Sequence, residues 1–235
     1  MSFSLLSFPA ALRVFCFPPI CLACRAVMES PAQPICPACR SALRPVRETD
    51  AIYRRAVYRL CGDGLIAGTR SLYHFEKGGP VQALVHALKY GDGAEIGLRL
   101  GKALGKQLPG QGLPADIRGI VPVPLHRVKE RERGYNQSVY LARGISREIG
   151  APVLANEVMR VRYTDSQTTL TIEQRRDNVA GAFSVRRRGR RVLNGGVVIL
   201  VDDVITTGST VRSCAAALRG AGVDTVYACS VGLAE

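Results

Sequence analysis

Apolar positions along the chain change repeatedly between helical and strand-like spacing, and this pattern predicts alternating strands and helices. Apolar residues recur at helical spacing in three segments: 81–88, 94–108 and 136–149. Five further segments predict strands: 65–75, 117–125, 152–162, 180–185 and 225–231. This alternation predicts an α/β fold with a doubly wound, mainly parallel sheet, in which ligands bind at the carboxyl ends of the strands.

The segment 197–201 predicts one more strand, and its five apolar residues run directly into two carboxylates, Asp202 and Asp203. A helix is predicted from about residue 210 to residue 220. Side chains alternate between faces along a strand, but the chain turns where a strand ends, so both acids can face one crevice. There they can accept hydrogen bonds from the vicinal hydroxyls of a ribose, or lie near a Mg²⁺ ion held by a ligand.

A loop of small polar residues follows the acids: Thr206, Thr207, Gly208, Ser209 and Thr210. Hydroxyls, backbone N–H groups and the start of a helix together form a phosphate-binding nest, and Gly208 lets the backbone approach closely. Two other interpretations remain. The acids resemble the Walker B pair of a nucleotide-driven motor, but the glycine spacing in 97–103 does not make the P-loop that such a motor needs. Alternatively, the stretch is a plain strand, turn and helix with acids near the cap.

The first part of the chain differs in composition, because residues 1–62 are rich in cysteine and proline and show little periodicity. We predict that 1–62 forms a small N-terminal module and linker and that 63–235 forms the α/β domain. The first 20 residues are apolar, but Arg13 lies among them and the features of an export signal are missing, which predicts a short docking helix in a cytoplasmic protein. No apolar run reaches the roughly 18 uncharged residues of a membrane span.

The cysteines of this module form two CxxC pairs: Cys21, Cys24, Cys36 and Cys39. Two such pairs supply the four thiolates of a closed, structural zinc site. Disulfides or a redox pair are the alternatives, although disulfides fit poorly with a chain that lacks an export signal. Cys16 is a spare candidate ligand. Cys61, Cys214 and Cys229 lie outside the cluster, and the last two are expected to be ordinary core thiols.

Basic residues outnumber acidic ones by 32 to 19, and the excess is concentrated in 160–191, which holds nine arginines and three acids. A positive field of this kind attracts phosphates on a small molecule or a nucleic acid, although most charge runs are solvated surface. Within this region 186–196 predicts a basic turn.

Three stretches resemble known sequences. "VILVDDVITTGST" (198–210) resembles the phosphoribosyl-pyrophosphate motif of type I phosphoribosyltransferases. "VPVPLHRVKERERGYNQSVYLAR" (121–143) and "RVRYTDSQTTLTIEQRRDNVAGAF" (160–183) closely resemble the competence-associated ComF family, as does "FPPICLAC" (17–24). The resemblance covers nearly the whole chain. Many members carry further paired cysteines downstream, whereas this chain has only Cys61 there.

The resemblance implies the sheet of a type I phosphoribosyltransferase and a role for each stretch. The backbone at Pro122 and Val123 would face pyrophosphate, with Lys89 and Arg133 as candidate ligands, although Lys89 is equally compatible with a surface role. Asn136 is expected to cap a helix, and His126 to be structural. The segment 160–183 corresponds to a mobile loop, whose candidate residues are Arg160, Thr164, Gln167, Arg175 and Arg176.

The implied activity is that of a glycosyltransferase: Mg²⁺-dependent transfer of phosphoribosyl from phosphoribosyl pyrophosphate to a nitrogen acceptor, with Asp202 and Asp203 as the catalytic acids. The alternative is a non-catalytic protein that handles single-stranded DNA with the DNA-uptake machinery and uses the ribose-phosphate site as a sensor. Aromatic residues make up only 6% of the chain and tryptophan is absent, which argues against a dedicated base-stacking platform.

Overall fold

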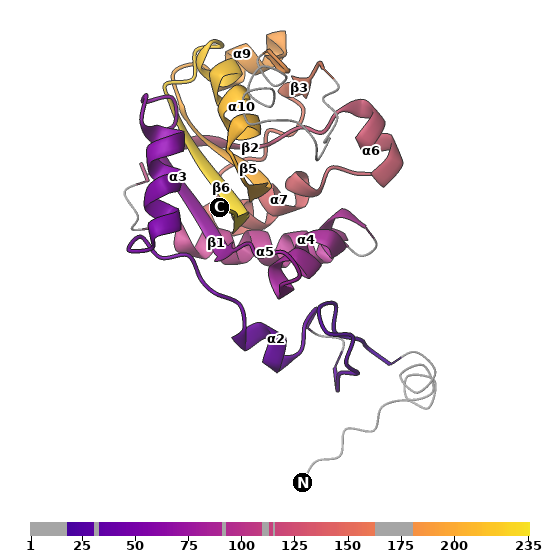
Figure 1. Cartoon of the computed structure of the whole chain (residues 1–235). Helices are drawn as coiled ribbons and strands as arrows, with labels where there is room; N and C mark the ends of the chain where they lie inside the picture. The colour runs from indigo at the N-terminus through magenta and orange to yellow at the C-terminus, as the bar shows by residue number, and fades with distance from the viewer. Residues whose placement is uncertain (1–17, 31–32, 91–92, 110–112, 115, 163–180) are drawn as a thin grey trace.

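The centre of the molecule is a parallel sheet. The computed structural model describes residues 18–30, 33–90, 93–109, 113–114, 116–162 and 181–235 (Figure 1). In this part of the chain, four strands pair in the order β1-β6-β5-β2. They are β1 (Gly68–His74), β2 (Ile117–Pro122), β5 (Val197–Ile205) and β6 (Thr225–Leu233). The predicted α/β class with a parallel sheet is therefore confirmed.

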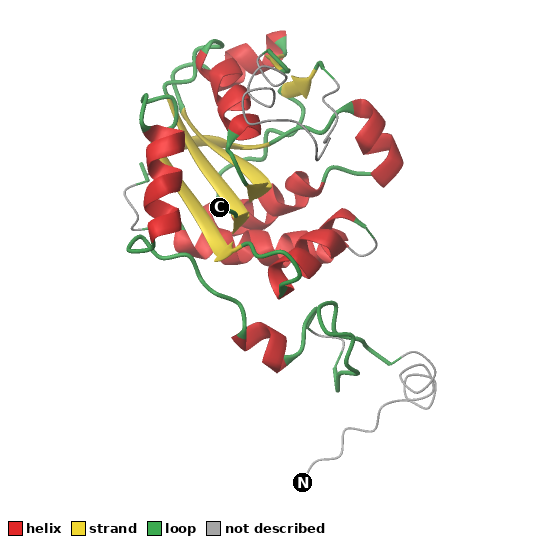
Figure 2. Ribbon diagram, viewed as in Figure 1, coloured by secondary structure: helices red, strands yellow, loops and turns green. Residues whose placement is uncertain are grey.

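Helices cover both faces of the sheet, as Figure 2 shows. Ile199 and Val201 of β5 belong to the core that contains α4 (Pro80–Lys89), α5 (Gly93–Gln107) and α7 (Gln137–Ile149). Val198 and Leu200 belong to the opposite core, which contains α3 (Ala51–Cys61) and α10 (Ser209–Arg219). Alternate residues of β5 thus enter different cores, as the run of five apolar residues requires of a strand covered on both sides.

Helices α5 and α7 cross with almost no space between their backbones. A side-chain carbon at Gly101 would collide with the carbonyl oxygen of Leu141, and one at Gly144 would lie 2.7 Å from the Cα of Gly101. Only glycine permits such an approach. This contact fixes α7, whose first turn supplies side chains to the candidate site.

A two-stranded antiparallel ribbon, β3 (Val158–Arg160) and β4 (Phe183–Val185), lies apart from the main sheet. The strand predicted over 152–162 is therefore confined to three residues. The basic turn predicted at 186–196 is wrong, because 187–193 forms α9 (Arg187–Leu193). Leu193 is completely buried and Gly189 packs against Glu157, so one side of this helix faces the core. The many arginines of the segment leave too few apolar residues for the sequence pattern to predict that side.

Three other helices lie where the spacing of apolar residues did not lead us to predict one: α2 (Pro37–Ser41), α3 and α6 (Arg127–Arg133). Ile52, Ala56 and Leu60 of α3 enter the core that also contains Val198 and Leu200 of β5. The division at residue 62 stays a prediction, although the helix before it packs on the sheet. The predicted docking helix falls mainly on 1–17, outside the described residues. Among the helices that the structure describes, none has the length and apolar character to cross a membrane.

Candidate functional site

The acid pair lies where the central strands part. Strand β2 ends at Pro122, opposite Val201, and the N–H of Val123 donates to the carbonyl of Val201 at 2.9 Å. Strand β5 continues beside β6 as far as Ile205, four residues beyond the end that we predicted. A crevice at the carboxyl ends of diverging parallel strands is the usual ligand position in such sheets.

Side chains do not alternate regularly around the acids. Val201 and Val204 pack against the same core, whereas Ile205 enters the opposite one. In a regular strand, residues three apart point to opposite faces. Strand β5 keeps its register with β6 as far as Ile205, yet both acids contact the start of α7, Asp202 through Ser138 and Asp203 through Gln137.

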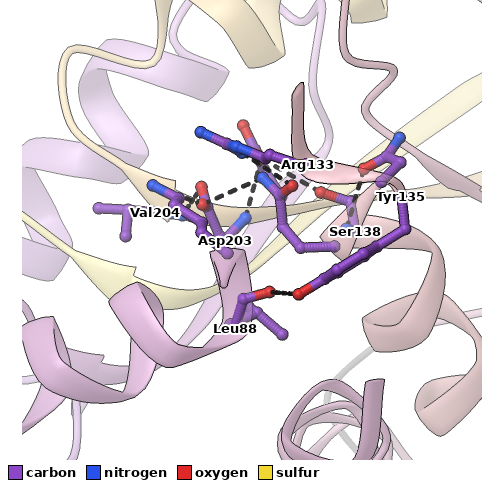
Figure 3. A network of polar contacts seen from close by, with 10 residues as sticks. Leu88, Arg133, Tyr135, Ser138, Asp203 and Val204 are labelled. Atoms are coloured by element: carbon purple, nitrogen blue, oxygen red, sulfur yellow. Dashed lines mark hydrogen bonds and ion pairs between the residues drawn. The ribbon is translucent and has the colours of Figure 1, made fainter. Parts of the chain in front are cut away.

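Asp203 is the more buried acid, and it holds a cation. Figure 3 shows Asp203 among the polar contacts that join β5 to the start of α7. Its Oδ2 lies 2.8 Å from Nζ of Lys89 and accepts a hydrogen bond from Nε2 of Gln137 at 3.2 Å. The carboxylate side chain is only 10% exposed, and that of Lys89 is 27% exposed. An ionised carboxylate with so little access to water needs a counter-charge. Lys89, for which the sequence left a surface role open, supplies it.

Asp202 has a different environment. Its Oδ1 accepts a hydrogen bond from the N–H of Asp203 at 2.8 Å and a longer one from Oγ of Ser138 at 3.4 Å. Burial and then the charge of Asp203 raise the pKa of Asp202 to about 8. The two adjacent acids therefore differ, with Asp203 paired to a cation and Asp202 favouring its protonated form when no ligand is bound.

The loop after β5 leads directly into α10. Gly208 is the N-cap of the helix and has φ of 78°, a left-handed conformation that favours glycine. The hydroxyls of Thr207 and Ser209 lie 2.9 Å apart. The first hydrogen bond of the helix runs from the N–H of Arg212 to the carbonyl of Gly208. The N–H groups of Thr210 and Val211 lie before this bond, at the end of the helix where backbone N–H groups have no partner within the helix. Such N–H groups at the positive end of a helix favour an anion.

A cavity of about 620 Å³ adjoins this loop. Thr207, Ser209, Arg59 and Arg212 contribute to its wall. A second cavity, of about 420 Å³, lies beyond the end of β2, where His126, Arg127 and Arg160 contribute to its wall. Both cavities are rich in cationic side chains, as expected of a site for phosphates.

The residues expected near pyrophosphate converge on the start of α7. Asn136 caps this helix, because its Oδ1 accepts the N–H of Ser138 at 3.0 Å, and its Nδ2 donates to the carbonyl of Val123 at 3.0 Å. The predicted capping role is confirmed. Nη1 of Arg133 donates to Oε1 of Gln137 at 3.0 Å. Gln137 thus connects Arg133 to Asp203, and Asn136 connects α7 to the end of β2.

The candidate mobile-loop residues are only partly within the described chain. Arg160 ends β3. Burial lowers the pKa of its guanidinium, and the charge of Asp202 partly offsets this effect. Thr164, Gln167, Arg175 and Arg176 lie outside the described residues.

The four module cysteines lie together. Their sulfur atoms are all within 4.8 Å of one another, and those of Cys24 and Cys36 are 3.7 Å apart. A tetrahedral ion with sulfur ligands at about 2.3 Å places its ligands roughly 3.8 Å from each other, so the cluster fits a metal. Burial opposes ionisation of Cys21, but backbone N–H groups of Cys24, Cys36 and Ala23 hold its pKa down to about 6. Burial and the neighbouring sulfurs raise the pKa of Cys39 to about 12.

Comparisons with known proteins agree with this geometry. The phosphoribosyl transferase domain model matches residues 136–233. Competence protein F of Haemophilus influenzae is 41% identical over 107 residues, which are 46% of each chain. DNA utilization protein YhgH of Salmonella typhi is 35% identical over 151 residues, 63% of this chain and 64% of its own. These matches support the resemblance to the ComF family.

The matches cover about half to two thirds of the length of these relatives. Among solved structures, the glutamine phosphoribosylpyrophosphate amidotransferase of B. subtilis, complexed with ADP and GMP, is 24% identical over 61% of this chain and 30% of its own, with a TM-score of 0.40. The family-model match contains the acid pair, the loop and α7, but neither α3 nor the four cysteines of the N-terminal module.

Three residues at the site were missed by reading the sequence. Gln137 and Ser138 are polar, yet they are 3% and 1% exposed. Their position directly after a helix cap and on the buried side of that helix could have indicated them. The third, Arg59, comes from α3, and no local pattern connects it with a loop almost 150 residues later.

We predict that Asp202→Asn changes how stability depends on pH. In the folded chain Asp202 keeps its proton up to about pH 8, whereas in the unfolded chain it loses it near pH 3.9. The folded state therefore binds more protons between these values, and ionisation of Asp202 lowers stability as pH rises through them.

Asparagine imitates the protonated acid, so the variant should gain up to about 4 kcal/mol relative to wild type between pH 5 and pH 8, at about 1.4 kcal/mol for each pH unit. Urea unfolding at a series of pH values measures the difference. Asp224→Asn, at an exposed acid, is the control. Parallel curves for wild type and Asp202→Asn would contradict the assignment.

Proposed function

We propose that the chain binds phosphoribosyl pyrophosphate with Mg²⁺ in the crevice at Asp202 and Asp203. The main support is the position of the two acids near the carboxyl end of the central strand β5, one short loop away from the start of α10. Carboxylates accept hydrogen bonds from vicinal hydroxyls, and the loop with its helix start favours a phosphate. A ribose 5′-phosphate presents both groups in one molecule.

Each neighbouring group has a role in this proposal. The segment Thr206–Thr210 holds the 5′-phosphate, while the backbone at Pro122 and Val123 faces pyrophosphate. Lys89 and Arg133 supply positive charge near the proposed pyrophosphate position. Lys89 is held there by its ion pair with Asp203, and Arg133 by its hydrogen bond to Gln137. Mg²⁺ bound with the substrate neutralises part of the diphosphate charge and so assists its departure.

Transfer to a nitrogen acceptor is the reaction that such a site supports. When the bond from the anomeric carbon to pyrophosphate breaks, positive charge develops on the ribose ring, as in other anomeric substitutions. The carboxylate of Asp203 stabilises that charge, and Asp202 adds to this when the cation of bound Mg²⁺ favours its ionised form. The tests measure binding first and transfer second.

Calorimetric titration with phosphoribosyl pyrophosphate, with and without Mg²⁺, tests the proposal. We expect Mg²⁺-dependent binding by wild type and a loss of at least about tenfold in Asp203→Asn, because the amide carries no charge to hold Lys89 or the sugar hydroxyls. Asp224→Asn removes the same charge at an exposed position and should bind as wild type does.

Release of pyrophosphate in the presence of nitrogen nucleophiles then distinguishes a transferase from a binding protein. Absence of Mg²⁺-dependent binding by wild type, or equal binding by Asp203→Asn, would refute the proposed site.

We further propose that the four-cysteine cluster holds a structural zinc ion. All four ligand positions of a tetrahedral zinc are filled by sulfur, so the site has no open position for catalysis. A cation would also let Cys39, whose pKa is raised, bind as a thiolate beside Cys21. Thiolates reserved for a metal fit a reducing compartment, which supports a cytoplasmic location.

Metal analysis of purified protein tests the zinc proposal. We expect about one zinc per chain in wild type and markedly less in Cys36→Ser after dialysis against a mild chelator. Cys61→Ser changes a cysteine outside the cluster and should retain zinc as wild type does. Equal zinc in Cys36→Ser and Cys61→Ser would rule out the assignment.

Handling of single-stranded DNA is the second candidate function, and the surface of α9 favours it. Five arginines are exposed at this helix and the residue before it: Arg186, Arg187, Arg188, Arg190 and Arg191. Clustered guanidinium groups bind phosphate backbones. The names of the relatives concern competence and DNA utilization, which agrees with a DNA partner.

Fluorescence anisotropy of a labelled single strand at several salt concentrations tests the second function. Binding should weaken as salt rises, and replacing Arg190 and Arg191 by alanine should reduce the slope of log affinity against log salt by about 0.7 for each phosphate that the variant no longer neutralises. The control replaces Lys77 and Lys106, two exposed lysines elsewhere, by alanine. Equal slopes for the two double variants would exclude α9 as the DNA surface.

A further inference from the structure

The C-terminal end of α3 contacts the candidate phosphate loop. Nη2 of Arg59 donates a hydrogen bond to the carbonyl oxygen of Thr206 at 2.7 Å. Helix α3 lies outside the residues that match the phosphoribosyl transferase domain, so neither the family model nor the sequence motif assigns this contact. It connects two segments that are 147 residues apart.

Two further contacts hold the end of α3 in this position. Leu60 packs so tightly against Gly208 that any side-chain carbon at that glycine would collide with it. Arg212, in the first turn of α10, donates through Nη1 to the carbonyl of Leu60 at 3.1 Å and through Nη2 to Asp63 at 2.6 Å. The loop therefore contacts α3 at Thr206 and at Gly208. Arg212, two residues after the loop ends, contacts α3 and the turn that follows α3.

Among the described residues, no carboxylate balances the charge of Arg59. None of the ion pairs among the described residues includes Arg59, and its Nε is buried with no hydrogen-bond partner in this part of the chain. Burial and then the charge of Arg55 lower the pKa of Arg59. An anion in the adjoining cavity, which Arg59 lines together with Thr207 and Ser209, would supply the missing negative charge.

The hydrogen bond to Thr206 has an electrostatic consequence for the loop. A backbone carbonyl carries a partial negative charge, and a carbonyl beside a bound phosphate repels it. A guanidinium that binds the carbonyl offsets this repulsion and fixes the peptide plane, so that the following N–H groups keep their orientation.

We infer that Arg59 is a positioning residue of the phosphate loop, acting through the carbonyl of Thr206 to favour a sugar with a terminal phosphate monoester. This inference rests on the proposed phosphoribosyl pyrophosphate site, and it adds a residue from the N-terminal part of the chain to that site. It makes α3 part of the binding machinery rather than part of a linker.

The test uses the full-length, metal-loaded protein and two probes, ribose 5-phosphate and inorganic pyrophosphate. Ribose 5-phosphate reports on the loop at 206–210, whereas pyrophosphate reports on the end of β2 with Lys89 and Arg133. Arg59→Ala should weaken binding of ribose 5-phosphate by about tenfold, in line with the loss of one charge-assisted hydrogen bond. Its affinity for pyrophosphate should change by less than about twofold.

Two matched variants separate contact from charge and stability. Arg54→Ala removes an exposed arginine from the same helix and should bind both probes as wild type does. Arg59→Lys retains the charge and can still donate a hydrogen bond, so it should recover part of the affinity for ribose 5-phosphate. Since both probes are measured on the same folded sample, a general loss of stability would lower both affinities and not their ratio.

The outcomes distinguish this inference from the proposed function. If wild type binds ribose 5-phosphate and Arg59→Ala binds it equally well, the inference fails and the proposed site remains. If Arg59→Ala loses both probes in the same proportion, Arg59 has only a structural role and the inference also fails. If wild type binds neither phosphoribosyl pyrophosphate nor ribose 5-phosphate, the proposed function fails and the inference fails with it.

Discussion

The ion pair between Lys89 and Asp203 is the interaction on which the site depends. Asp203 has little access to water, and its oxygen lies 2.8 Å from the lysine nitrogen. Without that cation, a buried acid next to a second acid would be strongly unfavourable. The pair also joins the end of α4 to the middle of the sheet, and Gln137 extends the connection to α7. Side chains from α4, β5 and α7 therefore meet at the carboxylate of Asp203.

This arrangement explains why the site needs a rigid scaffold. Helix α7 supplies Gln137 and Ser138 to the acids, and its position is fixed by the glycine contact with α5. Strand β5 is covered on both faces, so its carboxyl end cannot shift without disturbing two cores. On the other side of the loop, α3 and Arg212 hold Thr206 and Gly208. A loop of small residues has no bulk to fix its own shape, and its neighbours provide that constraint.

Most of the sheet and its main helices could be predicted from the spacing of apolar residues, since β1, β6, α4, α5, α7 and α10 each lie within a few residues of the expected bounds. Helix α3 was missed because cysteines and prolines dominate its surroundings, although Ile52, Ala56 and Leu60 are spaced four apart. At α9 the arginines concealed one anchoring residue, Leu193. The acids and the loop could be found from their order in the sequence, but the contacts from Lys89, Gln137 and Arg59 could not, because they arise when distant elements pack.

A crystal structure of the protein with phosphoribosyl pyrophosphate and Mg²⁺ tests the central claim most directly. The account predicts that the ribose hydroxyls contact Asp202 and Asp203, that the 5′-phosphate lies on the N–H groups of 206–210, and that Arg59 still binds the carbonyl of Thr206. The account would be contradicted if the ligand bound elsewhere, so that its ribose made no contact with Asp202 or Asp203 while Lys89 remained paired with Asp203.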